Sequence, residues 1–337
     1  MIFITGVAGF IGFHTAKALL ARGQAVVGID NLNDYYDPAL KATRLAQLQN
    51  HKDFVFYERD IADKEAVFDI LNAHPQIDQI IHLAAQAGVR HSLTNPFDYE
   101  HSNLMGHLVM LEAARHCHGS KGGLKHFIYA SSSSVYGANE KRPFATDDPV
   151  NAPVSLYAAT KRAGELMSQS YAHLYRIPST GLRFFTVYGA WGRPDMAYFS
   201  FTSDIAKGTP IKVFNHGQMK RDFTYIDDVV EGILGALAKP PASGTDKYCL
   251  HGAPHRLFNL GNNRTETLLD FIETIEDALG QKAEKIMSAM AAGDVAETFA
   301  DITQAKEIFG YNPKTPISEG IPQFVQWYKE FYTDSIS

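Results

Sequence analysis

Cysteine is scarce in this sequence of 337 residues, which contains only Cys117 and Cys249. Two cysteines cannot form the disulfide framework that holds small secreted domains together. Histidines flank Cys117, and His251 lies two residues after Cys249, but neither group has the repeated ligand spacing of a zinc site. We therefore expect neither structural disulfides nor a bound metal.

Long apolar runs and an excess of positive charge are also missing. No apolar stretch approaches the roughly 20 residues that a membrane-spanning helix needs. Met1 leads directly into an apolar run, without the basic segment of a secretory signal. The 37 acidic residues outnumber the 31 basic ones, and the net charge of −6 argues against nucleic acid as the main partner. We expect a soluble cytoplasmic protein with no membrane partner, which could still bind an anionic small molecule locally.

A glycine-rich loop joins the first predicted strand to the first predicted helix. The loop contains Gly6, Gly9 and Gly12, and the next predicted strand ends at Asp30. Glycines at this position bring backbone N–H groups against a pyrophosphate at the helix N-terminus. A carboxylate about 20 residues further on accepts hydrogen bonds from the ribose hydroxyls and repels a 2′-phosphate. The pattern predicts a site for NAD rather than NADP.

Predicted strands and helices alternate as far as residue 186. This alternation predicts an α/β fold with a doubly wound parallel sheet of the Rossmann type, in which ligands bind beyond the carboxyl ends of the strands. After residue 186 the segments are shorter and less regular. We expect an NAD-binding domain over residues 1–186 and a smaller α/β substrate lobe over most of 187–337, with segments of about 220–265 returning to the first domain. The predicted strands are 2–5, 25–29, 54–57, 79–83, 127–130 and 179–185, and the predicted helices are 10–22, 64–73, 96–117 and 157–175.

A tyrosine and a lysine lie four residues apart near the start of the helix predicted over 157–175. Four residues bring Tyr157 and Lys161 to the same face of that helix. A free tyrosine has a pKa of about 10, and a nearby ammonium lowers it toward the range in which a general base works at neutral pH. The serine run 131–134 follows a predicted strand and supplies a hydroxyl that could carry the proton. Alone, Tyr-x-x-x-Lys is more often just a helix with a buried tyrosine.

The complete set of motifs resembles the extended short-chain dehydrogenase/reductase family, and specifically its nucleotide-sugar epimerases that act on UDP-glucuronate. The resemblance covers nearly the whole chain. The segments that carry it are 5–12, 30–38, 82–90, 131–137, 157–161, 181–189, 192–196 and 221–228.

This resemblance implies NAD-dependent epimerisation of UDP-glucuronate to UDP-galacturonate at C4, through a 4-keto sugar. It implies that Ser132, Tyr157 and Lys161 are catalytic, and that tightly bound NAD is recycled in each turnover. Lys161 would lower the tyrosine pKa and hold the nicotinamide ribose. The implied NAD-binding residues are Gly6, Gly9, Phe10, Ile11, Gly12, Asp30, Asn31, Asp60, Ile61, Leu83, Ala84, Ala85, Tyr157 and Lys161.

The resemblance also implies a site for the UDP-sugar. Its expected residues are Gln86, Arg90, Ser133, Ser134, Thr186, Arg193, Asn215, Arg221 and Asp294. Arg193 with the hydroxyls would hold the sugar carboxylate, although a surface arginine is the alternative. Arg221 would bind the diphosphate or pair with a neighbouring aspartate. The family sequence Gln-Pro before Asp294 is here Ala291-Ala292, which makes nucleotide affinity less secure.

Related activities differ at the serine run. Dehydratases of the family carry Asp and Glu where this chain has Ser133 and Ser134, and decarboxylases typically have Glu at the position of Ser134. The open alternatives are a 4-epimerase of UDP-glucose/galactose or of an N-acetylated uronate, a UDP-glucuronate decarboxylase, and a non-catalytic NAD sensor. The resemblance further implies a homodimer whose seam is a four-helix bundle, made by the helices around 96–117 and 157–175.

Overall fold

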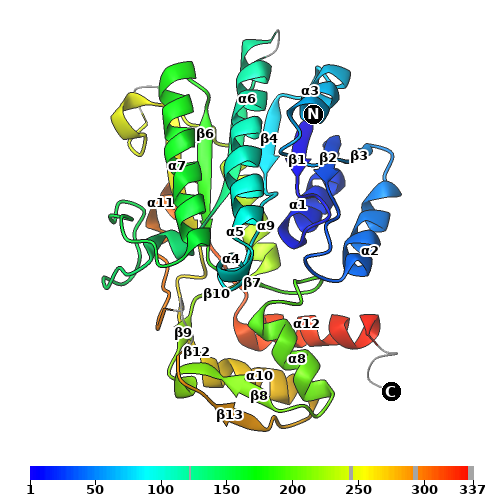
Figure 1. The fold of residues 1–337 in the computed structure, drawn as a ribbon, viewed down its shortest axis with the longest axis vertical. Helices are drawn as coiled ribbons and strands as arrows, with labels where there is room; N and C mark the ends of the chain where they lie inside the picture. Colours follow the sequence, from blue (N-terminus) through cyan, green and yellow to red (C-terminus); the bar gives the residue numbers. More distant parts are fainter. Residues whose placement is uncertain (121–122, 243–245, 291–294, 333–337) are drawn as a thin grey trace.

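The computed structural model describes residues 1–120, 123–242, 246–290 and 295–332. A large sheet with helices on both faces forms most of the molecule, and a smaller body lies at one end of it (Figure 1). No helix among the described residues is long and apolar enough to cross a bilayer.

The large sheet has seven parallel strands, with β1 (Ile2–Thr5) in the interior. On one side of β1 lie β2 and β3, and on the other side lie β4, β5, β6 and β11. This order reverses direction between β1 and β4, which is the crevice where doubly wound sheets bind their ligands. The arrangement confirms the predicted fold class. The other strands are β2 (Val26–Asp30), β3 (Phe54–Glu58), β4 (Gln79–His82), β5 (His126–Ser132), β6 (Ser179–Phe184) and β11 (His255–Leu260).

Separate hydrophobic cores lie on the two faces of the sheet. On one face, the helices that pack together are α3 (Lys64–Ala73), α6 (Gly106–Gly119) and α7 (Leu156–Tyr175). On the other face they are α1 (Phe10–Ala21), α2 (Pro38–Gln49) and α9 (Ile226–Leu237), with α11 (Thr303–Phe309) against α9 and β11. Local sequence fixes several helix starts: the Ser155 side chain, for example, accepts a hydrogen bond from the N–H of Ala158 and caps α7.

The predicted helix over 96–117 is wrong in one respect, because it is not a single regular α-helix. It consists of α5 (Pro96–Tyr99), a π-helical segment η1 (Glu100–Met105) and α6, and a short helix α4 (His91–Thr94) precedes it. The π segment places the Asn103 side chain in a buried position. There Asn103 accepts from the N–H of Gln86 and donates to the Gln86 carbonyl and the Thr160 hydroxyl. Tertiary hydrogen bonds of this kind leave no periodic signal in the sequence.

In the part of the chain that the structure describes, the smaller body consists of short strands and three helices. Its helices are α8 (Ala197–Ala206), α10 (Leu268–Leu279) and α12 (Ile317–Phe331), and its strand pairs are β8 (Ile211–Val213) with β13 (Lys285–Met287) and β9 (Lys220–Arg221) with β12 (Glu266–Thr267). A further pair, β7 (Thr186–Tyr188) with β10 (Phe223–Tyr225), joins this body to the large sheet. The short helical turns are η2 (Ser133–Tyr136), η3 (Phe214–Gly217) and η4 (Leu250–Gly252).

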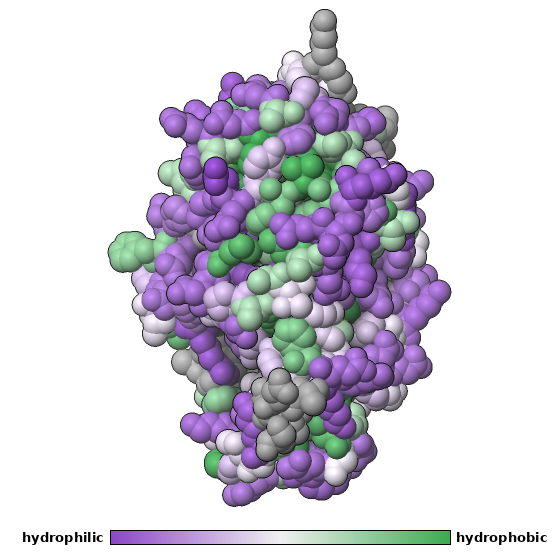
Figure 2. All heavy atoms as spheres, turned by 90° about the vertical axis from the view of Figure 1, so that its right-hand side faces the viewer, coloured by the Kyte–Doolittle hydropathy of each residue, from purple (hydrophilic) through white to green (hydrophobic). Residues whose placement is uncertain are grey.

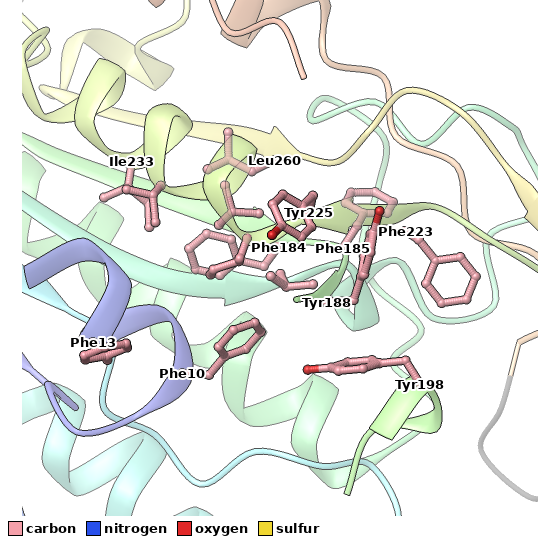
Figure 3. Packing of buried hydrophobic residues seen from close by; sticks show 14 of the residues in the cluster. Phe10, Phe13, Phe184, Phe185, Tyr188, Tyr198, Phe223, Tyr225, Ile233 and Leu260 are labelled. Carbon is pink, nitrogen blue, oxygen red and sulfur yellow. The ribbon is translucent and has the colours of Figure 1, made fainter. Parts of the chain in front are cut away.

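An aromatic core connects the two bodies. Phe184 at the end of β6 belongs to the same hydrophobic cluster as Tyr188 of β7 and Tyr198 of α8, and these side chains converge in one region (Figure 3). The rings of Phe223 and Phe271 stack with their centroids 3.9 Å apart. On the side of the molecule that carries α2, hydrophilic residues border a central band of more hydrophobic ones (Figure 2). The continuous core holds the smaller body in place beyond the carboxyl ends of the strands.

Candidate active site

A cleft of about 920 Å³ lies between the carboxyl ends of the large-sheet strands and the smaller body. Most of the residues predicted from the sequence line this one cleft. They are Gly6, Gly9, Phe10, Ile11, Gly12, Asp30, Asn31, Ile61, Leu83, Ala84, Ala85, Gln86, Arg90, Ser132, Ser133, Ser134, Tyr157, Lys161, Thr186 and Arg193. The cleft is therefore one continuous space from the glycine loop to the smaller body.

In the glycine loop, the backbone lies very close to neighbouring backbone segments, and side chains at the glycine positions would prevent this. Gly6 has a φ of +70°, and a Cβ there would lie 2.8 Å from the backbone nitrogen of Ala84. A Cβ on Gly12 would lie only 2.0 Å from the Gly6 carbonyl oxygen. Gly9 is the N-cap of α1 and supplies no side-chain cap, so the first N–H groups of the helix are open to an anionic ligand. These features fit the pyrophosphate of NAD.

Asp30 ends β2 beside this loop. Its carboxylate accepts hydrogen bonds from the N–H groups of Ala8 and Leu32, which fix its direction. Burial raises its pKa, while the charge of Lys41 opposes that rise. The neighbouring Asn31 donates to Asp60, which is absent from the cleft lining and instead orients Asn31 from behind. This end of the cleft thus presents acceptors for the ribose hydroxyls of a dinucleotide.

Ser132, Tyr157 and Lys161 meet where β5 ends and α7 begins. Burial raises the pKa of Tyr157, and a hydrogen bond from Ser132 and the charge of Arg193 oppose the rise. The Lys161 ammonium donates to the Ala130 carbonyl at 3.1 Å, and burial lowers its pKa to about 8. The expectation that Lys161 lowers the tyrosine pKa stays a prediction. Helical spacing brings the two residues to one face, but the lysine reaches toward β5 instead.

A buried ion pair supports the serine run from behind. Ser131 donates to Glu165 at 2.7 Å, and Glu165 accepts from Arg183 through both carboxylate oxygens, at 2.7 and 2.9 Å. Both charged side chains are almost completely buried. Such a paired and hydrogen-bonded network fixes the end of β5. Ser132, the next residue, accepts from the N–H of Ser134 at the start of η2 and faces the cleft.

The loop between β7 and α8 contributes a charged pair to the cleft wall. Arg193 contacts Asp195 through Nε, at 3.0 Å from Oδ1, and through Nη2, at 2.5 Å from Oδ2. Both residues line the cleft together with Ser133, Ser134 and Thr186. Arg193 is near enough to influence Tyr157, which gives the sugar region a cation beside the tyrosine. Arg193 therefore lines the cleft in its pair with Asp195 and is not a surface arginine turned to solvent.

Gln86 and Arg90 come from the loop after β4. Gln86 is buried and is held at its backbone by Asn103. Arg90 is exposed at the cleft edge, where its guanidinium carbon lies 4.8 Å from the centroid of the Phe214 ring. This contact joins the large body to the smaller one across the cleft.

The structure does not bring every predicted substrate residue into the cleft wall. Asn215 donates to the carbonyl of Gln218, and Arg221 donates to the carbonyls of Lys220 and Ala296. Neither residue is part of the cleft lining. Asp222, the candidate ion-pair partner of Arg221, instead accepts backbone hydrogen bonds from Asn262 and Ala300. Asp294, with the Ala291 and Ala292 positions before it, lies outside the described residues.

Several cleft residues have no assigned role in the sequence-based prediction. The most prominent are Tyr35, Lys41, Asp195, Lys212 and Phe214. Tyr35 lies inside the segment 30–38 that carries the family resemblance, and Asp195 lies inside 192–196. These motifs could have indicated that each residue contributes to the site, but nothing in the sequence indicates that the two residues meet. No group of three or more potential metal ligands occurs among the described residues.

The sequence signature of the NAD dependent epimerase/dehydratase family matches residues 2–250. The chain belongs to this family. A probable UDP-glucuronate 4-epimerase from Rhizobium meliloti is 46% identical over 338 residues, which cover 98% of this chain and 97% of that protein.

Solved structures of family members have the same overall fold. UDP-glucuronic acid 4-epimerase from Bacillus cereus, in complex with UDP-glucuronic acid and NAD, superposes with a TM-score of 0.87 and 34% identity over 98% of this chain and 99% of that one. UDP-glucose 4-epimerase from Thermotoga maritima, with UDP-glucose, gives a TM-score of 0.84 and 30% identity over the same shares of the two chains.

Proposed function

We propose that this protein catalyses the NAD-dependent 4-epimerisation of UDP-glucuronate to UDP-galacturonate. One observation carries the proposal: the cleft combines a hydrogen-bonded Ser132–Tyr157 pair with the Arg193 cation close enough to act on the same tyrosine. The first pair suits proton transfer at the sugar 4-hydroxyl. The arginine suits a carboxylate at C6. Similarity to the Rhizobium meliloti and Bacillus cereus proteins supports the same activity.

The residues of the cleft have distinct roles in this reaction. Ser132 relays the proton between the 4-hydroxyl and Tyr157, and Tyr157 stores it and gives it back. When bound, NAD supplies a reversible hydride acceptor for C4 of the sugar. The residues proposed to hold NAD are those given above for the glycine loop, Asp30, Asn31, Ile61 and the segment 83–85, together with Tyr157 and Lys161. Asp60 is proposed to contribute through its hydrogen bond with Asn31. We propose that Gln86, Arg90, Asn215, Arg221 and Asp294 contribute to UDP binding.

Side reactions must be suppressed while the sugar is oxidised. A 4-keto uronate is a β-keto acid, so its C5–C6 bond breaks when that bond aligns with the carbonyl π system. The hydroxyls of Ser133, Ser134 and Thr186, with Arg193, hold the carboxylate out of this alignment. Neither Ser133 nor Ser134 has the acidity or basicity that elimination of water would require. The serine run thus favours epimerisation over decarboxylation and dehydration.

Product analysis tests the proposal. The purified protein, with no added NAD, is incubated with UDP-glucuronate, UDP-glucose and an N-acetylated UDP-uronate in parallel. We expect UDP-galacturonate to form fastest and with little CO₂. Stoichiometric CO₂ release would assign the protein to the decarboxylases, and faster turnover of UDP-glucose would assign it to the neutral-sugar epimerases. Bound NAD without turnover of any sugar would indicate a sensor.

We also propose that the protein is a homodimer whose interface is a four-helix bundle. Large apolar side chains are exposed along α5, η1 and α7, which include Phe97 at 81%, Leu174 at 63%, Leu166 at 55% and Met105 at 45%. Helices α6 and α7 pack side by side on the same face (Figure 1). Exposed apolar areas of this kind mark interaction sites. Sedimentation of wild type and of Leu174→Asp tests this, because we expect a dimer and a monomer respectively.

Two further proposals concern organisation and location. We propose that residues 1–186 form the NAD-binding domain and most of 187–337 the substrate lobe, with 220–265 partly returning. The position of β11 in the large sheet supports the returning segment. We propose a cytoplasmic location, which two unpaired cysteines, one of them buried, support.

A further inference from the structure

Arg193 is held by a neighbour in its own loop. The Nε–Oδ1 distance of 3.0 Å and the Nη2–Oδ2 distance of 2.5 Å describe two roughly parallel hydrogen bonds to Asp195. The two side chains are only 22% and 27% exposed. A bidentate pair fixes the plane of the guanidinium as well as its position. Asp195 therefore decides in which direction Arg193 points.

Tyr35 joins this pair from the cofactor side of the cleft. Its hydroxyl donates to Oδ2 of Asp195 at 3.1 Å, across 160 residues of sequence. The Tyr35 loop follows β2, whereas the Asp195 loop follows β7. The hydrogen bond consequently connects the strand end that delivers Asp30 with the loop that carries Arg193.

The segment that leads from Gly88 into α4 packs against the same phenol. The ring of Tyr35 lies 4.7 Å from that of His91, measured between centroids, in an edge-on arrangement. Gly88 has a φ of +102°, and a Cβ there would lie 2.5 Å from the Tyr35 hydroxyl oxygen. Only glycine allows this approach without displacing the tyrosine. We call Tyr35, Arg193 and Asp195 the Tyr35–Asp195 clasp.

In the clasp, the two edges of the Arg193 guanidinium are available to different carboxylates. A guanidinium can pair with a carboxylate through its Nε/Nη2 edge or through its Nη1/Nη2 edge. Asp195 occupies the Nε/Nη2 edge, so a second carboxylate has the Nη1/Nη2 edge. We propose that Asp195, fixed in turn by Tyr35, is a positioning residue that sets Arg193 to hold the uronate carboxylate. This inference rests on the proposed function.

An opposite role for Asp195, as a charge that only neutralises Arg193, predicts the opposite result. Although burial opposes ionisation, Arg193 and the hydrogen bond from Tyr35 lower the pKa of Asp195, so it is ionised at neutral pH. The clasp then carries little net charge. If Asp195 merely neutralised Arg193, removing its charge would strengthen uronate binding. If Asp195 positions Arg193, removing its charge weakens uronate binding, because direction rather than net charge then provides the affinity.

Loss of position has a second, chemical consequence. In the 4-keto sugar, a carboxylate that turns into alignment loses CO₂: the C5–C6 bond breaks, its electron pair forms the enolate of the C4 carbonyl, and C5 then takes a proton from water. A clasp that fails to hold Arg193 raises the share of turnovers that end in CO₂. A residue with a purely structural role would not change this share.

The test compares Asp195→Asn and Tyr35→Phe with wild type and with Tyr248→Phe. Tyr248 provides a matched control, since its hydroxyl donates to Glu307 on the surface, away from the cleft. For each protein we would measure kcat and KM for UDP-glucuronate, the Ki of UDP, CO₂ released per UDP-galacturonate formed, bound NAD and Tm. UDP lacks the glucuronate moiety, so its Ki reports nucleotide binding alone.

For Asp195→Asn we expect KM for UDP-glucuronate to rise at least about tenfold, because small misplacements of a positioning group have effects of this size. The Ki of UDP should stay within about twofold, and the CO₂ share should rise. Tyr35→Phe should also raise the KM for UDP-glucuronate and the CO₂ share, but by less. Tyr248→Phe should match wild type. A lower KM in Asp195→Asn, or an unchanged KM and CO₂ share in both variants, would overturn the inference.

Failure of the proposed function gives a different pattern. In that case wild type itself makes no UDP-galacturonate, whatever the clasp does. If Asp195→Asn fails to fold, as shown by its Tm, Tyr35→Phe decides the question, because it removes one hydroxyl and keeps the ring packed against His91.

Discussion

The two ends of the cleft are built in different ways. At the cofactor end, the backbone forms most of the site: strand ends, the glycine loop and the N-terminus of α1 present N–H groups at positions that packing fixes, and the Asp30 carboxylate adds acceptors. At the sugar and nucleotide end, side chains from loops form the site through ion pairs, hydrogen bonds and a cation–aromatic contact, such as Arg193 with Asp195 and Arg90 with Phe214. At the cofactor end, we expect added side-chain volume at the glycines to disrupt the site. At the sugar and nucleotide end, we expect substitutions to be tolerated structurally and to change substrate specificity.

Of all the substitutions, Gly12→Ala should have the largest effect on NAD binding. A small effect would contradict the contrast between the two ends of the cleft. The new Cβ would lie 2.0 Å from the Gly6 carbonyl oxygen, which is backbone and cannot move aside. We expect loss of bound NAD or of soluble protein. Gly119→Ala is the control, since a Cβ there meets nothing within 4 Å and should have little effect. Absorbance and mass analysis of bound NAD, with yield and Tm, provide the measurement. Normal NAD content in Gly12→Ala would contradict the backbone-built site.

Tyr157→Phe should remove catalysis while leaving the backbone-built end intact. The Tyr157 side chain is half-buried and its phenol is hydrogen-bonded to Ser132, and phenylalanine nearly keeps its volume. Because a positioned acid–base group contributes about 10²–10⁴-fold, we expect kcat to fall by about 10³-fold with NAD still bound. Near-normal turnover of UDP-glucuronate would exclude Tyr157 as the acid–base residue.

Arg90→Ala and Arg221→Ala sharpen the comparison at the other end. Arg90 lines the cleft, whereas Arg221 donates to two backbone carbonyls beside it. If each arginine bound the diphosphate equally, both variants would raise the Ki of UDP alike. We expect about a tenfold rise for Arg90→Ala, typical of a lost charged hydrogen bond, and a smaller one for Arg221→Ala. An equal or larger rise for Arg221→Ala would support the sequence-based assignment of Arg221 to the diphosphate.

The same contrast explains what the sequence predicts well. The strands of the large sheet, the helices over 64–73 and 157–175 and the glycine loop follow from local rules: apolar runs, helix caps and turn residues. Parallel strands end at one edge, so residues that follow them must meet. Tyr35 and Asp195 obey no such rule, because 160 residues separate them and each lies in an irregular loop. The direction of the Lys161 side chain likewise depends on a tertiary contact, the hydrogen bond to the Ala130 carbonyl of β5.

The buried histidines of the large body should make the stability of the fold depend on pH. We expect this effect to be smaller than those of the substitutions above. Burial lowers the pKa of His107 and His126 to about 3 and that of His255 to about 4. Between these values and the unfolded value of about 6.5, the unfolded chain binds protons that the folded chain does not. Stability is therefore complete above pH 6.5 and falls as the pH decreases.

Each of these histidines should contribute about 1.4 kcal/mol per pH unit to that decrease. Urea unfolding of wild type and His107→Gln at pH 7.5, 6.5 and 5.5 measures it. Glutamine retains a polar group opposite the Ser168 hydroxyl, which lies 2.9 Å from Nε2 of His107. We expect a shallower slope in the variant between pH 6.5 and 5.5. Asp222, whose pKa burial raises to about 7, acts in the opposite direction but equally in both proteins. Identical slopes would mean that His107 takes up its proton in the folded state.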